Sequence, residues 1–249
     1  MKNYYILLLA LCVILPTQAQ KKPKSIKVSY LKSSNGKVLG NQDPILLFTS
    51  EKTSLVSTEK IRLQKADFPI EQVFVDFQLK TISQLAQFKN QSTILSIDSL
   101  ALGKQNFTFS TETRKILGYN CKKATTSINS NTIELWYTDE LNLKGAPSAL
   151  GQDLGLVLEM VRNGNSKVTA NKIEILKNVP PFLKLPIPQP KIVDQLTYKD
   201  LLWKSRFTSI PIFEKEIINF SDAAQSNDSI LRFANGTIIV KKVRFPKIK

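Results

Sequence analysis

Apolar and polar residues alternate with a period of two along much of this chain, and the clearest run lies between residues 73 and 80. One side of that run carries Val73, Val75, Phe77 and Leu79, while the other carries Phe74, Asp76, Gln78 and Lys80. Successive side chains of a β-strand point to opposite faces, so this pattern predicts a half-buried strand.

Similar segments recur and predict further strands. They cover residues 26–31, 45–49, 105–110, 120–128, 132–137, 156–161, 167–176 and 237–245. Clusters of turn-forming residues separate several of them, at residues 34–36, 129–131 and 163–165. Because strands joined by short turns pair antiparallel, we expect a meander. Within residues 132–137, the alternation places Trp136 beside Glu134 on the more exposed side of the sheet.

The pattern changes near residue 179, because five prolines fall within residues 180–190. Proline lacks the backbone donor that a sheet requires, so this stretch predicts an extended strap or linker. Thr197 then has the position of a helix cap, with Asp200 three residues later, and predicts a short helix. Asn235-Gly236 is the strongest hairpin signal in the chain.

These patterns divide the chain into four parts, and the fold class they predict is mainly β. We expect a cleaved signal peptide over residues 1–19 and an antiparallel β domain over residues 20–178. A proline-rich strap should follow over residues 179–196. A short helix and a C-terminal hairpin, over residues 197–249, should pack on the same domain.

The first 19 residues are typical of a secretory signal. Lys2 gives a short basic start, an apolar run covers residues 4–15, and residues 17–19 form a cleavage site that ends in Ala19. Cys12 does not fit a lipidation site, because the bulky Leu11 precedes it. Later apolar runs are too interrupted to span a bilayer. The sequence therefore predicts an exported protein, in the periplasm or associated with the outer membrane.

The charge balance bears on partners. The chain has 35 basic and 20 acidic residues, which gives a formal net charge of +15. A basic protein is drawn to anionic surfaces, so an anionic membrane surface or an envelope protein is the expected partner. The alternative is that the lysines only keep the surface soluble. Nucleic acid is not expected, because the basic clusters are not interleaved with aromatic residues. The oligomeric state stays open.

This chain contains no histidine, which limits the chemistry that its own residues can perform. They cannot build a Ser-His-Asp or Cys-His arrangement, or a zinc site that uses imidazole. Cys121, the only cysteine after the leader, is expected to be a buried thiol rather than a nucleophile. Asp139 and Glu140 are expected in a solvated turn. The sequence shows no calcium, phosphate or dinucleotide motif, so no metal or cofactor and no catalytic residue is assigned.

The run from Ile116 to Ala124, Ile-Leu-Gly-Tyr-Asn-Cys-Lys-Lys-Ala, precedes Trp136-Tyr137 and then a glycine-leucine segment at residues 155–159. In these residues the chain resembles the GLPGLI family of secreted proteins from Gram-negative bacteria, named after a Gly-Leu-Pro-Gly-Leu-Ile core. Gly155 and its leucine match that core, whereas residues 152–154 replace its first glycine, leucine and proline. The resemblance implies a curved antiparallel sheet or half-barrel, like that of lipoprotein carriers, and no known activity.

The same region supplies the predicted contacts for a ligand or partner. They are Trp136, Tyr137, Gly155, Leu156 and Leu158. The favoured hypothesis is a non-catalytic periplasmic or envelope protein whose concave sheet binds an apolar ligand or a partner segment beneath the strap and helix. One alternative is an accessory interaction protein beside an outer-membrane receptor. The other is a hydrolase that uses carboxylates or lysine without histidine.

Overall fold

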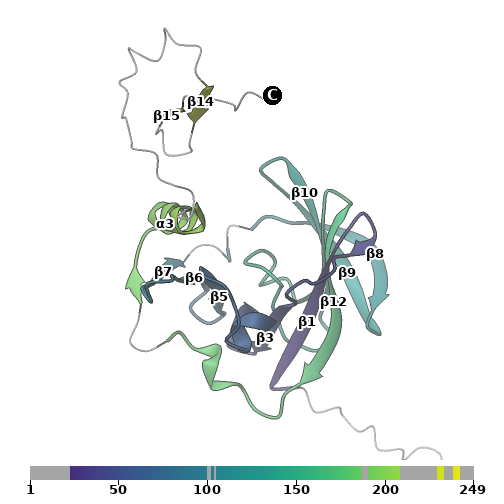
Figure 1. The fold of residues 1–249 in the computed structure, drawn as a ribbon. Coiled ribbons are helices and arrows are strands. Elements are labelled where there is room, and N and C mark those ends of the chain that lie inside the picture. The colour runs from purple at the N-terminus through teal and green to yellow at the C-terminus, as the bar shows by residue number, and fades with distance from the viewer. Residues whose placement is uncertain are drawn as a thin grey trace, which may run out of the picture. The chain divides into compact units, whose positions relative to one another are not determined.

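An open sheet of 13 strands organises the first part of the computed structural model (Figure 1). The structure describes residues 23–99, 102–103, 105–186, 190–207, 229–232 and 238–241. The chain separates into two units, residues 1–206 and residues 207–249, and each is described by itself. The predicted signal peptide lies outside the described residues.

The sheet consists of two antiparallel meanders that share one strand. The first meander is β3 (Ile45–Ser50), β4 (Thr53–Thr58), β5 (Ile70–Asp76), β6 (Thr81–Gln87) and β7 (Thr93–Asp98). The second is β8 (Thr108–Ile116), β9 (Tyr119–Ile128), β10 (Asn131–Thr138), β11 (Leu156–Arg162) and β12 (Ser166–Ile175). Strand β1 (Ser25–Ser34) lies between β3 and β12 and pairs antiparallel with both. The predicted mainly β, antiparallel sheet is therefore confirmed.

The ends of the sheet are not joined. The order of neighbouring strands runs from β13 (Lys191–Ile192), which pairs parallel with β7, to β8 at the other edge. The short β2 (Lys37–Val38) pairs only with β1. Figure 1 shows that the sheet curves strongly between its two meanders, so the architecture is an open curved sheet and not a closed barrel.

Different segments cover the two faces of the first meander. Leu46 and Phe48 alternate with Leu47 along β3, so they point to the opposite face. The segment 139–155 covers the Leu47 face, and an added Cβ at Gly145 would lie 3.0 Å from a Leu47 methyl group. The proline-rich strap covers the other face, where the rings of Phe182 and Phe48 meet edge to face with centroids 5.0 Å apart. Apolar burial on both faces holds this half of the sheet together.

Two helices flank the sheet. The short α2 (Glu59–Arg62) follows β4, and α3 (Gln195–Phe207) follows the strap, which contains the 3-10 turn η2 (Pro181–Leu183). Helix α3 packs Tyr198 and Leu202 against Ala86 and Ile94 of the sheet. No helix in the described parts of the chain is long and apolar enough to cross a bilayer.

Helix α3 begins earlier than the sequence predicts. Asp194, not Thr197, is the capping residue, because its carboxylate accepts hydrogen bonds from the backbone N–H groups of Leu196 and Thr197, each 2.9 Å long. Its other oxygen accepts the Thr197 hydroxyl at 2.5 Å. These hydrogen bonds, the Thr197 hydroxyl first, lower the pKa of Asp194.

The strand predicted for residues 73–80 ends at Asp76. The Asp76 carboxylate accepts the backbone N–H groups of Gln78 and Leu79, which turns the chain, and Leu79 is 71% exposed. Five of the described strands were not predicted, namely β2, β4, β6, β7 and β13. Strands β2 and β13 contain only two residues each, and β4, β6 and β7 each carry at least one buried serine, which interrupts the apolar pattern.

The second unit contains one described hairpin-like pair. Strand β14 (Ser229–Arg232) pairs antiparallel with β15 (Ile238–Lys241), in the region where the sequence predicts a hairpin. The expected turn at Asn235-Gly236 lies outside the described residues.

Candidate functional site

The five predicted contact residues are buried and do not form one surface, because Trp136, Leu156 and Leu158 belong to one core cluster and Tyr137 belongs to another. Trp136 and Tyr137 are 6% and 7% exposed, and Leu156 and Leu158 are fully buried. Gly155 has a φ of +142°, and an added Cβ would lie 2.8 Å from an Asp139 carboxylate oxygen and 3.0 Å from the Thr138 carbonyl oxygen. Its role in this structure is to permit a close backbone approach at the start of β11.

Trp136 lies on the predicted side of the sheet, but it is covered. The guanidinium carbon of Arg114 stands 3.9 Å from the centroid of the indole ring, and the Lys123 ammonium stands 5.7 Å from it. The expectation that this indole is more exposed is therefore wrong, because two basic side chains from β8 and β9 lie over it.

Arg114 also holds a buried carboxylate. Its Nη2 lies 2.5 Å from Oε1 of Glu159, whose side chain is 9% exposed, and the Thr169 hydroxyl donates to Oε2 at 2.8 Å. Both carboxylate oxygens are thus satisfied. Nε of Arg114 is buried and has no hydrogen-bond partner in the structure. The arrangement joins three strands, β8, β11 and β12, on one face of the sheet.

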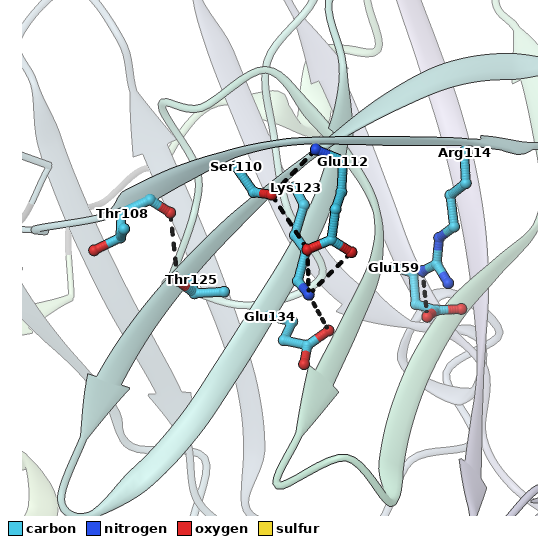
Figure 2. Close-up of polar contacts among 8 residues, drawn as sticks. All are labelled: Thr108, Ser110, Glu112, Arg114, Lys123, Thr125, Glu134 and Glu159. Carbon is cyan, nitrogen blue, oxygen red and sulfur yellow. Dashed lines mark hydrogen bonds and ion pairs between the residues drawn. The ribbon is translucent and has the colours of Figure 1, made fainter.

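A bulge in β8 places a second acidic side chain on the same face. Phe109 pairs with Ala124 and Thr113 pairs with Lys122, so residues 110–112 stand opposite Lys123 alone. The Ser110 hydroxyl accepts the backbone N–H of Glu112 at 3.1 Å, which fixes the bulge. Figure 2 shows the result, in which the Glu112 carboxylate reaches the ammonium of Lys123.

Lys123 is shared by two carboxylates. Its Nζ lies 3.2 Å from Glu112 and 3.5 Å from Glu134 of β10. The hydrogen bond from Lys123 lowers the pKa of Glu112, and the hydrogen bond from Glu112 raises the pKa of Lys123. A carboxylate that is held ionised in this way is a poor proton donor at neutral pH, so this cluster does not have the properties of a general acid.

A hollow of about 380 Å³ continues this polar face toward the end of the strands. It is lined by Asn106, Phe107, Thr108, Thr125, Thr126, Ser127 and Thr132. Two of the cross-strand pairs in it carry hydroxyl groups on both partners, Thr108 with Thr125 and Ser127 with Thr132. The lining contains no charged side chain. Its hydroxyl groups and one aromatic ring suit a neutral, polar ligand.

The remaining candidates take structural roles. Cys121 is fully buried, as predicted, and burial raises the pKa of its thiol to about 11. Asp139 and Glu140 are exposed, as expected for a solvated turn, and are held by Lys122 and Asn120 respectively. Among the described residues, no group of three or more Cys, Asp or Glu side chains could hold a metal ion.

The hydroxyl hollow was not recognised from the sequence. In the sequence, the feature that could have indicated it is the run Ala-Thr-Thr-Ser at residues 124–127. This run is followed by the turn at residues 129–131 and then by Thr132. Alternation predicts both strands, but only their register places these hydroxyls side by side.

Two family matches cover most of the chain. Residues 28–200 match the family described as "N-glycanase peptide, N-terminal domain", and residues 209–249 match "Peptide-N-glycosidase F, N terminal". The comparison with curated proteins gave no match.

Solved structures agree with these matches. PNGF-II in space group P21 is 48% identical, with a TM-score of 0.72, and the alignment covers 91% of this chain and 42% of that one. PNGF-II in space group C2 is also 48% identical, with a TM-score of 0.68 over 90% of this chain and 41% of that one. The chain therefore spans about two fifths of the length of these relatives.

These findings overturn the resemblance to GLPGLI proteins. The resemblance rested on the run Ile116–Ala124, on Trp136-Tyr137 and on the glycine-leucine segment at residue 155. In the structure the last of these is the start of β11, where Gly145 bridges Leu156, and short matches of this kind are not specific. The hypothesis of a non-catalytic carrier for an apolar ligand is also wrong, because the relatives are glycanases and the residues expected to contact that ligand are buried. By its match over residues 28–200, the chain belongs to the family of N-glycanase N-terminal domains.

Proposed function

We propose that the protein removes N-linked glycans from peptides as a peptide-N-glycosidase, with residues 23–206 forming its N-terminal β domain. The observation that carries this proposal is the succession of two matches in one chain, first to an N-glycanase N-terminal domain and then to the N-terminal part of peptide-N-glycosidase F. Of the hypotheses drawn from the sequence, the hydrolase that works without histidine is the one that agrees best with this proposal.

We propose that the β domain binds the substrate and does not cleave the bond. Its buried carboxylate, Glu159, is neutralised by Arg114, and Glu112 and Glu134 share Lys123. Glycosidases commonly use one protonated and one ionised carboxyl group on either side of the scissile bond. Carboxylates that are each paired with a cation do not provide that combination.

Export remains part of the proposal and rests on the leader-like residues 1–19. N-linked glycans are carried on surface loops of secreted proteins, so an exported enzyme would meet its substrate. Attachment to the outer membrane or to an anionic surface stays a prediction.

Mass spectrometry of an N-glycosylated peptide incubated with the natural protein, purified from its own cells, tests the proposal. We expect the glycan to be released as one piece, while the same peptide without glycan is unchanged. Recovery of the glycopeptide intact would overturn it. The variants Glu112→Gln and Glu134→Gln should release glycan within about twofold of the unchanged protein, whereas loss of release with correct folding would place cleavage in the β domain.

A further inference from the structure

We propose that the hydroxyl-lined hollow on β8, β9 and β10 is a subsite for the saccharide portion of an N-glycosylated substrate. This inference rests on the proposed function for the identity of the substrate, but the hollow itself is a feature of the β domain. It is lined by residues 106–108, 125–127 and 132.

Hydroxyl groups that can bond to a ligand line the hollow. Within the described residues, the structure records no hydrogen bond to the side-chain hydroxyls of Thr108, Ser127 and Thr132. Thr125 makes only a long contact of 3.4 Å to the Thr108 carbonyl oxygen (Figure 2). Each hydroxyl can donate one hydrogen bond and accept two, which suits a ligand that is itself covered with hydroxyl groups.

A second hollow in the domain, of about 260 Å³, differs from the first in its polar groups. Gln105 and Gln195 line it, but their amide groups already bond to the protein. Gln105 donates to the Ala149 carbonyl and accepts from the Gly151 N–H, while Gln195 bonds to Ser96 and Gln84. Those amides hold the fold and are not free for a ligand.

The lining of the hollow is uncharged. The chain as a whole is strongly basic, yet the hollow has no charged lining residue. The ionic groups closest along β9 and β10, Lys123 and Glu134, are bound to each other. A neutral polyhydroxylated ligand therefore fits better than an anion. Phe107 packs partly against the core, and the part of its side chain that lines the hollow supplies a small apolar surface for the carbon face of a sugar.

The edge of the sheet beside the hollow is less suited to the peptide part of the substrate. A peptide that binds a sheet usually adds a strand to a free edge. The edge strand beside the hollow is β8, where the bulge at residues 110–112 interrupts the ladder and charged side chains follow at Arg114 and Lys115. Bulges and charges of this kind hinder strand addition. The face of the sheet is the more suitable surface.

Titration calorimetry of the full chain, with a free high-mannose N-glycan as the probe, tests this assignment. The double variant Thr108→Val and Thr132→Val removes two hydroxyls with little change of shape and should weaken binding at least tenfold. Thr113→Val is the matched control, since this threonine is exposed on the same strand outside the hollow, and it should bind normally. Ser127→Ala, measured alone, should weaken binding in the same direction.

Two results would overturn the subsite, and a third would separate it from the proposed function. No binding of the N-glycan, or equal binding by the double variant with an unchanged melting temperature, overturns the subsite. Competition by the same peptide without glycan, at equal strength, would assign the hollow to peptide and also overturn it. If the glycan binds as expected but the natural protein releases no glycan from a glycopeptide, the proposed function fails and the subsite stands.

Discussion

Arg114 on β8 and Glu159 on β11 form an ion pair of 2.5 Å across the two strands that lie between them. The pair fixes the edge strand to the middle of the second meander, and the guanidinium at the same time covers Trp136. A single side chain from the edge thus shields an aromatic ring and neutralises a buried carboxylate.

Replacing Arg114 by Met should destabilise the domain by about 2–4 kcal/mol, because the Glu159 charge would stay buried without its partner. Adding Glu159→Gln should restore part of that loss, since the remaining group would be neutral. Urea unfolding followed by circular dichroism measures both. A loss below about 0.5 kcal/mol for the single variant would show that solvent already screens this pair.

Gln152 should contribute as much to the unfolding free energy as an apolar core residue does. Its side chain is fully buried, accepts the Ser54 hydroxyl at 2.9 Å, and donates to the carbonyl groups of Ala146 and Ser148. Gln152→Leu leaves these groups without partners and should cost about 2–4 kcal/mol of unfolding free energy.

Asp153→Asn is the neighbouring control for Gln152. Asp153 pairs with Lys144 at the surface, where both side chains are 52% exposed, so its loss should stay within about 0.5 kcal/mol. Equal effects of the two variants in thermal unfolding would refute the view that the buried amide anchors segment 139–155.

Alanine at Gly155 should be far more damaging than alanine at Gly118. Both residues have positive φ, but a Cβ at Gly155 meets the Thr138 carbonyl oxygen at 3.0 Å, whereas at Gly118 it meets nothing within 4 Å. We expect about 2–4 kcal/mol for Gly155→Ala and about 1 kcal/mol for Gly118→Ala. Melting temperatures of the two variants give the comparison, and the opposite order would contradict the crowding seen at the start of β11.

The docking of α3 should weaken at alkaline pH. Burial raises the pKa of Tyr198 from 10.0 to about 12, so the folded state holds the phenol proton more tightly than the unfolded state. The contribution of Tyr198 is therefore fully present below pH 10 and is lost as the pH rises from 10 to about 12. Unfolding free energies measured against pH should show this fall, and Tyr198→Phe should make it smaller, because the buried thiol of Cys121 and the buried phenol of Tyr30 also have raised pKa values and contribute the rest. A variant with the same alkaline fall as the unchanged protein would assign the effect to other groups.

The sequence pattern predicted the strands whose buried face is apolar, and it failed where serine takes a buried position. Ser54, Ser57 and Ser96 interrupt the alternation of β4 and β7. Each bonds to a glutamine distant in sequence or on the neighbouring strand, namely Gln152, Gln72 and Gln195. Local periodicity cannot identify the glutamine that hydrogen-bonds to such a buried serine, because the two residues are far apart in the sequence or lie on different strands.

The exposure of Trp136 at the candidate site also could not be predicted from local alternation. Alternation correctly placed it beside Glu134 on one face, but exposure depends on what crosses that face. Arg114 comes from an edge strand whose register against β9 is shifted by the bulge at residues 110–112, and its guanidinium lies over the indole ring. The hydroxyl hollow likewise depends on the register of three strands, which no single segment specifies.

The position of β1 between the two meanders determines the order in which the strands can pair during folding. Tyr30 pairs with Ile45 on one side and with Ala170 on the other, and its hydroxyl donates to the Val157 carbonyl at 2.7 Å. One edge of β1 can pair soon after synthesis, but the other must wait until the whole second meander has emerged. Contacts of such long sequence separation slow folding. Until β12 arrives, β1 leaves an open edge on which chaperones or other chains can act, so the first strand made is among the last to be fully paired.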